Sequence, residues 1–195
     1  MATGCGGGSR QDAGEHAGTF EMKLLHAAFP TKQAVARPAR MVLQVRNTGS
    51  HTVQNVAVTV DSFNYTEKFA ELAANKRPIW AIERGPGAQA KLPVETQEVS
   101  SPGGAQTAYL NTWALGRLAP GKTASFSWNV VPVKPGSHTV HFVFSAGLSG
   151  KAKARLASGG LVSGQFTVDI APAPPITHVD PSTGRIASGA YSATP

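Results

Sequence analysis

Two neighbouring runs of alternating apolar and polar residues constrain the fold of this chain more than any other feature. In the first run, residues 124–130, apolar Phe126 and Trp128 alternate with serine and asparagine. The second run, residues 140–144, continues the same alternation after a Lys-Pro-Gly turn. A period of two is typical of a strand with one buried face. The Pro-Gly turn between the runs therefore predicts an antiparallel hairpin.

Shorter segments with the same character occur along most of the chain. We expect further strands at residues 19–28, 40–46, 53–61, 109–115, 151–157 and 164–170, and residues 79–82 could add a brief edge strand. Turns separate them in a chain that contains 21 glycines, 14 prolines and only 15% charged residues. Such spacing and composition predict an all-β fold, an immunoglobulin-like antiparallel β-sandwich of about seven or eight strands.

The inward phase of these runs defines a predicted core. Its members are Met41, Leu43, Val45, Val56, Val58, Phe126, Trp128, Val140, Phe142, Phe144, Phe166 and Val168. Replacing a large buried aromatic residue by alanine removes both its transfer free energy and its packing, so Trp128→Ala is expected to cost about 3–5 kcal/mol.

The chain divides into a tether, one domain and a tail. Residues 1–18 are rich in glycine and alanine and predict a flexible tether, and residues 19–170 hold the sandwich. An insertion at residues 62–111 interrupts the strand pattern, with a short helix expected at 66–76 and a long loop at 83–105. Residues 171–195 are rich in proline, serine and glycine and are expected to be disordered.

Cys5 is the single cysteine, so the chain forms no internal disulfide. Residues 2–9, ATGCGGGS, resemble the end of a bacterial lipoprotein signal, in which small residues precede the lipidated cysteine. The apolar segment of such a signal does not precede Cys5 in this sequence. Two interpretations follow: the protein starts upstream of Met1 and Cys5 carries lipid, or the likeness is accidental and Cys5 is an idle thiol. The first interpretation predicts an extracytoplasmic, membrane-anchored lipoprotein.

Two segments resemble a known family. They are residues 45–60, VRNTGSHTVQNVAVTV, and residues 118–146, LAPGKTASFSWNVVPVKPGSHTVHFVFSA. Both are similar to the CARDB family, the cell-adhesion-related domains of bacteria, and to neighbouring surface-repeat families with immunoglobulin-like folds. Residues 19–170 as a whole resemble uncharacterised actinobacterial envelope lipoproteins. The resemblance implies a surface location and a role as spacer or binder, without shared catalytic residues.

One segment matches a nucleotide-binding pattern. Residues 116–123, GRLAPGKT, fit the phosphate-binding loop, and Asp61 ends an apolar run of the kind that holds magnesium. The phosphate loop must open a helix, whereas residues 124–130 alternate as a strand. We therefore expect a turn that opens a strand and no nucleotide cofactor.

Other chemistry is not indicated. His138 and His141 are three residues apart, which places them on opposite faces of a strand, so no metal site is expected. The chain contains no Gly-x-Ser-x-Gly nucleophile motif. The sequence predicts no catalytic, cofactor-binding or metal-binding residues.

Binding is expected beside the insertion. Trp80, Arg84, Tyr109 and Trp113 flank its two ends, and these residue types dominate binding hot spots. They are the candidate ligand contacts. The alternative interpretation is that Trp80 and Trp113 close the edge of the sandwich, since aromatic residues are mostly core.

The net charge is +7, but the basic residues are dispersed along the chain and form no block of like charges. No nucleic-acid role is therefore expected. We expect a non-catalytic cell-envelope binding or structural module, held to the membrane by a lipid anchor and contacting a cell-wall glycan or a surface protein. One alternative is an accessory carbohydrate- or protein-binding domain that serves a partner enzyme. Another is a hydrolase with an unrecognised site in residues 62–111.

Overall fold

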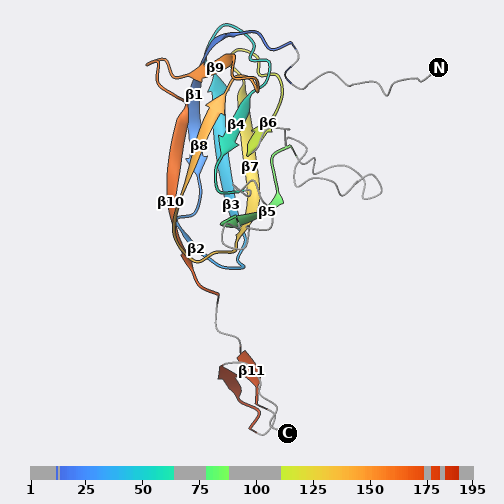
Figure 1. Cartoon of the computed structure of the whole chain (residues 1–195), viewed down its shortest axis with the longest axis vertical. Helices are drawn as coiled ribbons and strands as arrows, with labels where there is room; N and C mark the ends of the chain where they lie inside the picture. Colours follow the sequence, from blue (N-terminus) through green and yellow to red (C-terminus); the bar gives the residue numbers. More distant parts are fainter. Residues whose placement is uncertain are drawn as a thin grey trace, which may run out of the picture.

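A computed structural model shows two five-stranded β-sheets, drawn in Figure 1. It describes residues 12, 14–63, 78–87, 111–173, 177–180 and 183–188. The first sheet has the order β5-β7-β3-β1-β9 and the second the order β2-β10-β8-β4-β6. The strands of the first sheet are β1 (Gly18–Ala28), β3 (Ala39–Asn47), β5 (Trp80–Arg84), β7 (Thr123–Pro132) and β9 (Ala152–Arg155). Those of the second are β2 (Lys32–Ala34), β4 (Ala57–Val60), β6 (Thr112–Ala114), β8 (Gly136–Ser145) and β10 (Ser163–Ala171). The prediction of an all-β sandwich is confirmed.

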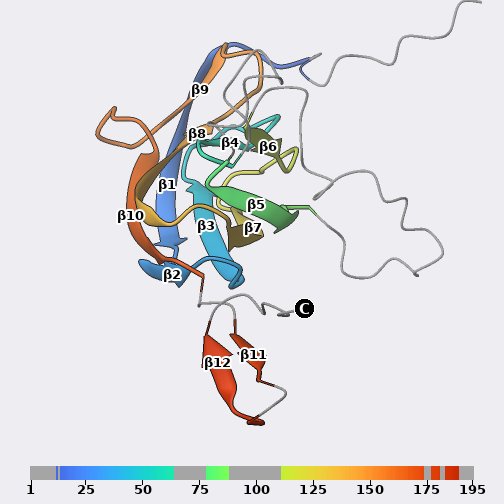
Figure 2. The ribbon, with the colours of Figure 1, turned by 60° about the horizontal axis from the view of Figure 1, so that its bottom comes forward.

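Successive strands alternate between the two sheets. All odd-numbered strands of the sandwich belong to the first sheet and all even-numbered strands to the second. Each strand therefore hydrogen-bonds only to strands that are not its neighbours in the chain. In Figure 2, β7 lies between β5 and β3 in this manner.

The predicted hairpin between β7 and β8 is wrong for the same reason. β7 pairs with β3 and β5, whereas β8 pairs with β10 and β4, so the turn between them crosses from one sheet to the other. Alternation fixes which face of a strand is buried, but it does not fix the strand's partner. Pro132 and Pro135 flank the turn. Proline has no N–H to donate, which removes two bonds that a tight hairpin would need.

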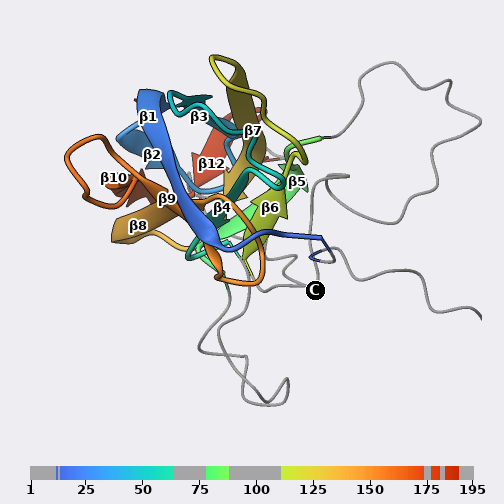
Figure 3. The ribbon, with the colours of Figure 1, turned by 90° about the horizontal axis from the view of Figure 1, so that it is seen from above.

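The sandwich has ten strands, more than predicted, and its sheets are not wholly antiparallel. β1 pairs with β9 in parallel, and β10 pairs with β2 in parallel; the first of these pairs can be followed in Figure 3. β2 has only three residues, too few to show a period in the sequence. The alternation of apolar and polar residues is the same in parallel and antiparallel strands, so the parallel pairs could not be predicted from this alternation.

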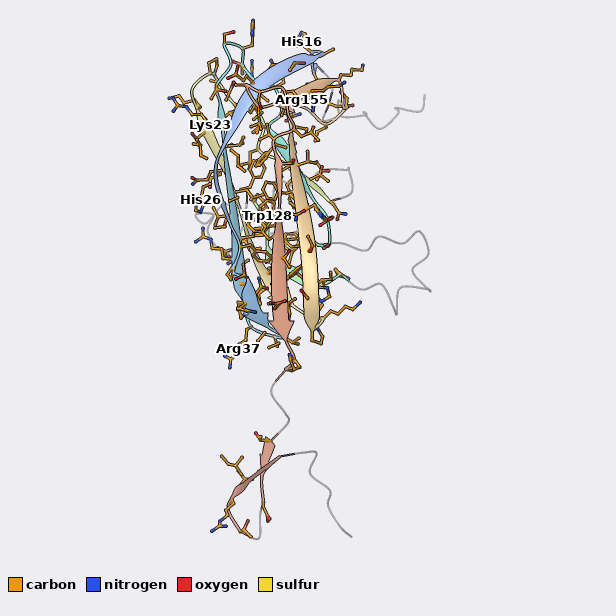
Figure 4. All side chains as sticks on the ribbon, turned by 90° about the vertical axis from the view of Figure 1, so that its left-hand side faces the viewer. His16, Lys23, His26, Arg37, Trp128 and Arg155 are labelled. Carbon is orange, nitrogen blue, oxygen red and sulfur yellow. The ribbon has the colours of Figure 1, made fainter. Side chains whose placement is uncertain are left out.

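The core lies between the sheets, where Figure 4 shows Trp128. All predicted core residues are buried except Phe166, which is half-buried and packs against the core. Phe63 lies at the centre of an aromatic cluster, with ring centroids 6.0 Å from Trp80, 6.3 Å from Trp113 and 6.1 Å from Trp128. These edge-on contacts are the geometry that aromatic rings prefer.

Two predicted segments fall largely outside the described residues. The expected helix at residues 66–76 and most of the loop at 83–105 are among them. The tail contains a hairpin that was not predicted, in which β11 (Thr177–Val179) pairs with β12 (Ile186–Ser188). No helix that is long and apolar enough to cross a membrane occurs in the described part of the chain.

Candidate functional site

A groove lies on the outer face of the second sheet, over β8 and its neighbours β4 and β10. Its volume is about 440 Å³. It is lined by Thr59, Asp61, His141, Phe142, Val143, Leu161, Ser163, Gly164 and Gln165. We call it the Asp61–His141 groove.

Asp61 and His141 form a hydrogen-bonded polar pair in this groove. Oδ1 of Asp61 accepts a hydrogen bond from the backbone N–H of His141 at 2.7 Å, and Oδ2 lies 2.8 Å from Nδ1 of the same residue. The backbone N–H of Asp61 donates to the carbonyl of His141 at 3.1 Å. Oδ1 thus holds the backbone of His141, and Oδ2 orients the imidazole. Nε2 remains the ring atom that is available to a ligand.

Gly164 shapes the floor of the groove. It lies directly opposite Phe142 in the β8–β10 pair, and a Cβ added at Gly164 would lie 2.5 Å from Cζ of the Phe142 ring. Because glycine has no side chain, the Phe142 ring covers the glycine backbone on the core side of the sheet, where Phe142 is buried. On the outer side, Gly164 contributes backbone and no side chain to the floor of the groove.

The walls of the groove combine apolar and polar groups. Leu161 is 55% exposed, and Thr59 bonds to Thr112 through their hydroxyls at 2.9 Å. A lining of apolar side chains with a few placed polar groups is typical of ligand-binding sites.

Trp80 and Trp113 are core residues rather than surface ligand contacts. Their exposed fractions are 0% and 1%, and Nε1 of Trp80 donates to Oε1 of Gln33 at 2.8 Å. β5 and β6, which carry them, are edge strands of the two sheets. A ligand cannot reach either indole unless the sandwich opens, so their prediction as ligand contacts is wrong. The alternative prediction, that they close the sandwich edge, matches the structure.

The other predicted contacts do not join them. Arg84 is exposed at the end of β5 and lies opposite Asn129 of β7, on the outer face of the first sheet. Tyr109 lies outside the described residues, as do Cys5 and most of the 62–111 insertion where the hydrolase alternative placed its site.

Residues 116–123 form a turn that opens β7, as predicted. The N–H of Gly121 donates to the carbonyl of Asn47 at 2.8 Å, and β7 begins at Thr123. The amide that would bind a phosphate is therefore committed to a backbone bond. No helix follows it.

The two histidines of β8 are separated as expected. His138 is half-buried and lies edge-on to Trp80, with ring centroids 6.2 Å apart, whereas His141 points outward to Asp61. Among the described residues, no group of three or more histidine, cysteine or acidic side chains could hold a metal ion.

Asp61 and His141 belong to separate sequence patterns, the first to the nucleotide-binding pattern and the second to the histidine pair, and neither pattern brings them together. They are separated by 80 positions in the chain. The sequence signal that could have linked them is their position in the strands, because Asp61 directly follows β4 and His141 occupies an outward position of β8. That signal becomes useful only once β4 and β8 are known to be neighbours.

Glu15 attaches the segment before β1 to the loop between β8 and β9. Its carboxylate accepts hydrogen bonds from the backbone N–H groups of Leu148 at 2.7 Å and Ser149 at 3.0 Å, and from the side-chain amide of Asn55 at 3.0 Å. Partial burial alone would raise the pKa of Glu15, but these hydrogen bonds outweigh it and hold the pKa below its ordinary value. The carboxylate therefore stays ionised and fixes where the N-terminal segment leaves the sandwich.

Comparison with known proteins gives fold neighbours only. No protein-family model matches the chain, and no curated protein matches it. Similar solved structures include the CARDB domain of a Pyrococcus furiosus protein in complex with di-metal ions, at 14% identity over 78% of this chain and 96% of that chain, with a TM-score of 0.44. A CARDB domain is thus among the neighbours, as the sequence resemblance suggested.

Two other neighbours are much longer than this chain. Escherichia coli alpha-2-macroglobulin, from domain MG7 to the C-terminus, is 15% identical over 85% of this chain and 21% of that chain, with a TM-score of 0.43. Pseudomonas fluorescens alkylpurine DNA glycosylase AlkC, bound to DNA containing an abasic site analog, is 10% identical over 78% of this chain and 31% of that chain, with a TM-score of 0.37. The chain spans less than a third of either.

Proposed function

We propose that this protein is a non-catalytic binding module of the cell envelope, anchored to the membrane by lipid on Cys5, which holds a polar ligand in the Asp61–His141 groove. The observation that carries the proposal is the oriented imidazole of His141. Asp61 fixes its Nδ1 side, and His141 lines the groove beside polar and apolar residues. A polysaccharide or peptide of the cell wall offers the hydroxyl and amide groups that such a site would bind.

The Glu15 attachment supports an anchor on the N-terminal side. Glu15 follows Cys5 by ten positions. A segment of that length spans at most roughly 35 Å when fully extended. A lipid on Cys5 would therefore keep the sandwich close to the bilayer, with its exit point fixed by Glu15.

The anchor is tested by membrane partition in the native host. The gene is expressed with its upstream region, and wild type is compared with Cys5→Ala after detergent phase separation. We expect wild type in the detergent phase and Cys5→Ala in the aqueous phase. Wild type in the aqueous phase, or an in-frame stop codon directly upstream of Met1, would refute the anchor.

The groove is tested by binding to purified cell-wall polysaccharide and peptidoglycan fragments. His141→Ala is expected to weaken binding at least about tenfold, since a lost hydrogen bond to a ligand costs on the order of 1–2 kcal/mol. The matched control is Thr167→Ala, on the same sheet face but outside the groove. Equal binding by wild type and His141→Ala would remove the groove as the site.

A further inference from the structure

The outer face of the first sheet gathers cations that are dispersed in the sequence. Lys23 of β1 lies directly opposite Arg46 of β3. Further along the sheet, Asn129 of β7 lies opposite both Arg40 of β3 and Arg84 of β5. Inward residues alternate with Lys23, Arg40 and Arg46. In β5, a bulge between Ile82 and Arg84 breaks the alternation and places Arg84 opposite outward-facing Asn129, so the four cations share the solvent side of the sheet. We call Lys23, Arg40, Arg46 and Arg84 the basic face.

The basic face is not neutralised within the described part of the chain. None of its four cations forms an ion pair there. Glu83 is the one carboxylate on β3, β5 or β7, and Glu21, further along β1, accepts a bond from Thr48. Like charges directly opposite each other destabilise a strand pair. The Lys23–Arg46 pair therefore creates a cost that a bound anion would relieve.

The outer face of the second sheet differs in charge. Lys32 there bonds to Asp169 at 2.6 Å, which lowers the pKa of that carboxyl, and Asp61 is paired with His141. The sandwich thus has one face with unpaired positive charge and one with paired charges and hydroxyls. Figure 4 shows Lys23 and His26 projecting from the same side of the sandwich.

The shape of the basic face favours a surface over a groove-bound ligand. The face is one side of a sheet, crossed by Ser125, Ser127 and Asn129 of β7, and Ser127 accepts a hydrogen bond from Nε of Arg40 at 2.9 Å. Leu25 is the extra residue of a bulge in β1, between Lys23 and His26, and is 45% exposed. An apolar side chain among cations suits the boundary between lipid headgroups and acyl chains, where each basic residue near an anionic surface adds to binding.

We propose that the basic face lays the sandwich against an anionic phospholipid surface. Lys23, Arg40, Arg46 and Arg84 contact headgroup phosphates, and Leu25 enters the interface. This inference rests on the proposed membrane-anchored function and adds an orientation to it. The Asp61–His141 groove, on the opposite sheet, then faces away from the membrane.

The test uses the unlipidated chain, so its result does not depend on Cys5. Binding is measured by co-sedimentation with large vesicles of phosphatidylcholine, with and without one third phosphatidylglycerol. We expect binding only to the vesicles that contain phosphatidylglycerol, with affinity falling as salt rises. The double variant Arg40→Ala/Arg46→Ala is expected to bind at least about tenfold more weakly.

Two controls separate the face from net charge and from other polyanions. Arg117→Ala/Lys134→Ala removes the same charge from exposed positions off the basic face and is expected to keep wild-type binding. Leu25→Ser keeps the charge and is expected to weaken vesicle binding but not binding to duplex DNA. Thermal melts establish that each variant is folded.

Three results would overturn the proposal: no binding to anionic vesicles at low salt, an equal loss in the control double variant, or duplex DNA bound more tightly than vesicles with no effect of Leu25→Ser. A lipid anchor that fails while vesicle binding persists would refute the anchor and leave the basic face in place.

Discussion

The backbone N–H of Gly121 donates to the carbonyl of Asn47 across 2.8 Å, and Asn47 is completely buried. The Asn47 side chain continues this connection. Its Nδ2 donates to the carbonyls of His51 and Leu118, each at 2.9 Å, and its Oδ1 accepts from Gly49 at 3.1 Å. One asparagine therefore holds both the turn after β3 and the loop before β7.

Asn47→Leu is expected to lower the free energy of unfolding by about 2–4 kcal/mol. The substitution keeps the branching of the side chain at Cγ but leaves buried carbonyls and an amide without partners, at about 1–3 kcal/mol for each buried group. Chemical denaturation measures the loss. Gln44→Leu, on the outer face of the same strand, is the control and should stay within about 0.5 kcal/mol of wild type.

Gly164→Ala is expected to destabilise the sandwich by about 1–3 kcal/mol, as overpacking does. The new methyl group would lie 2.5 Å from the Phe142 ring, which packs against Phe144 and Phe166 and has little room to move. Gly159→Ala is the matched control. A Cβ added at Gly159 has no neighbour within 4 Å, although the positive φ of 86° carries backbone strain there. The double variant Gly164→Ala/Phe142→Leu should recover part of the loss, and full additivity would contradict the proposed clash.

Glu15 is expected to make stability depend on acidity. Its pKa is lowered in the folded state, so its contribution is complete above the unfolded value near 4.5 and is lost as the pH falls through the folded pKa. The difference in unfolding free energy between wild type and Glu15→Gln should therefore be constant near neutral pH and shrink below about pH 4.5. Because Asp169 titrates in both proteins, its own lowered pKa cancels in this difference. A difference that grows on acidification would contradict the assignment.

Trp128→Ala is expected to cost about 3–5 kcal/mol, as anticipated from the sequence. Trp128→Phe should cost clearly less, because phenylalanine keeps an aromatic ring in the core and leaves a smaller cavity. Nε1 of Trp128 has no hydrogen-bond partner among the described residues, so its loss adds no broken bond in either variant. Thermal unfolding of the two variants gives the order. A loss for phenylalanine as large as the loss for alanine would contradict this prediction, because Nε1 and not the packing of the ring would then carry the contribution of Trp128.

The buried face of each long strand could be predicted from the sequence, and the partners of the strands could not. Met41, Leu43 and Val45 are buried because alternation is a local property of one strand. The pairing of β7 with β3 depends on contacts between distant segments, which a period of two does not encode. The same limit hid the basic face, since Lys23 and Arg46 meet only after β1 and β3 pair.

The candidate binding residues were hard to predict for the same reason, because their contacts depend on which strands pair. Tryptophan is a residue type that is common on binding surfaces, but Trp80 and Trp113 lie on edge strands that turn their side chains inward onto Phe63. Asp61 and His141 carry no sequence motif, and only the β4–β8 ladder makes them a pair.

The strict alternation of strands between the sheets has a consequence for synthesis of the protein. β10 lies between β2 and β8, so the edge strand β2 is joined to the second sheet only by the last strand of the sandwich. A nascent chain that ends before residue 163 leaves β2 without its neighbour and one side of β8 open. Such an open side is a template for aggregation. Cooperative closure must therefore wait until the end of the domain has left the ribosome.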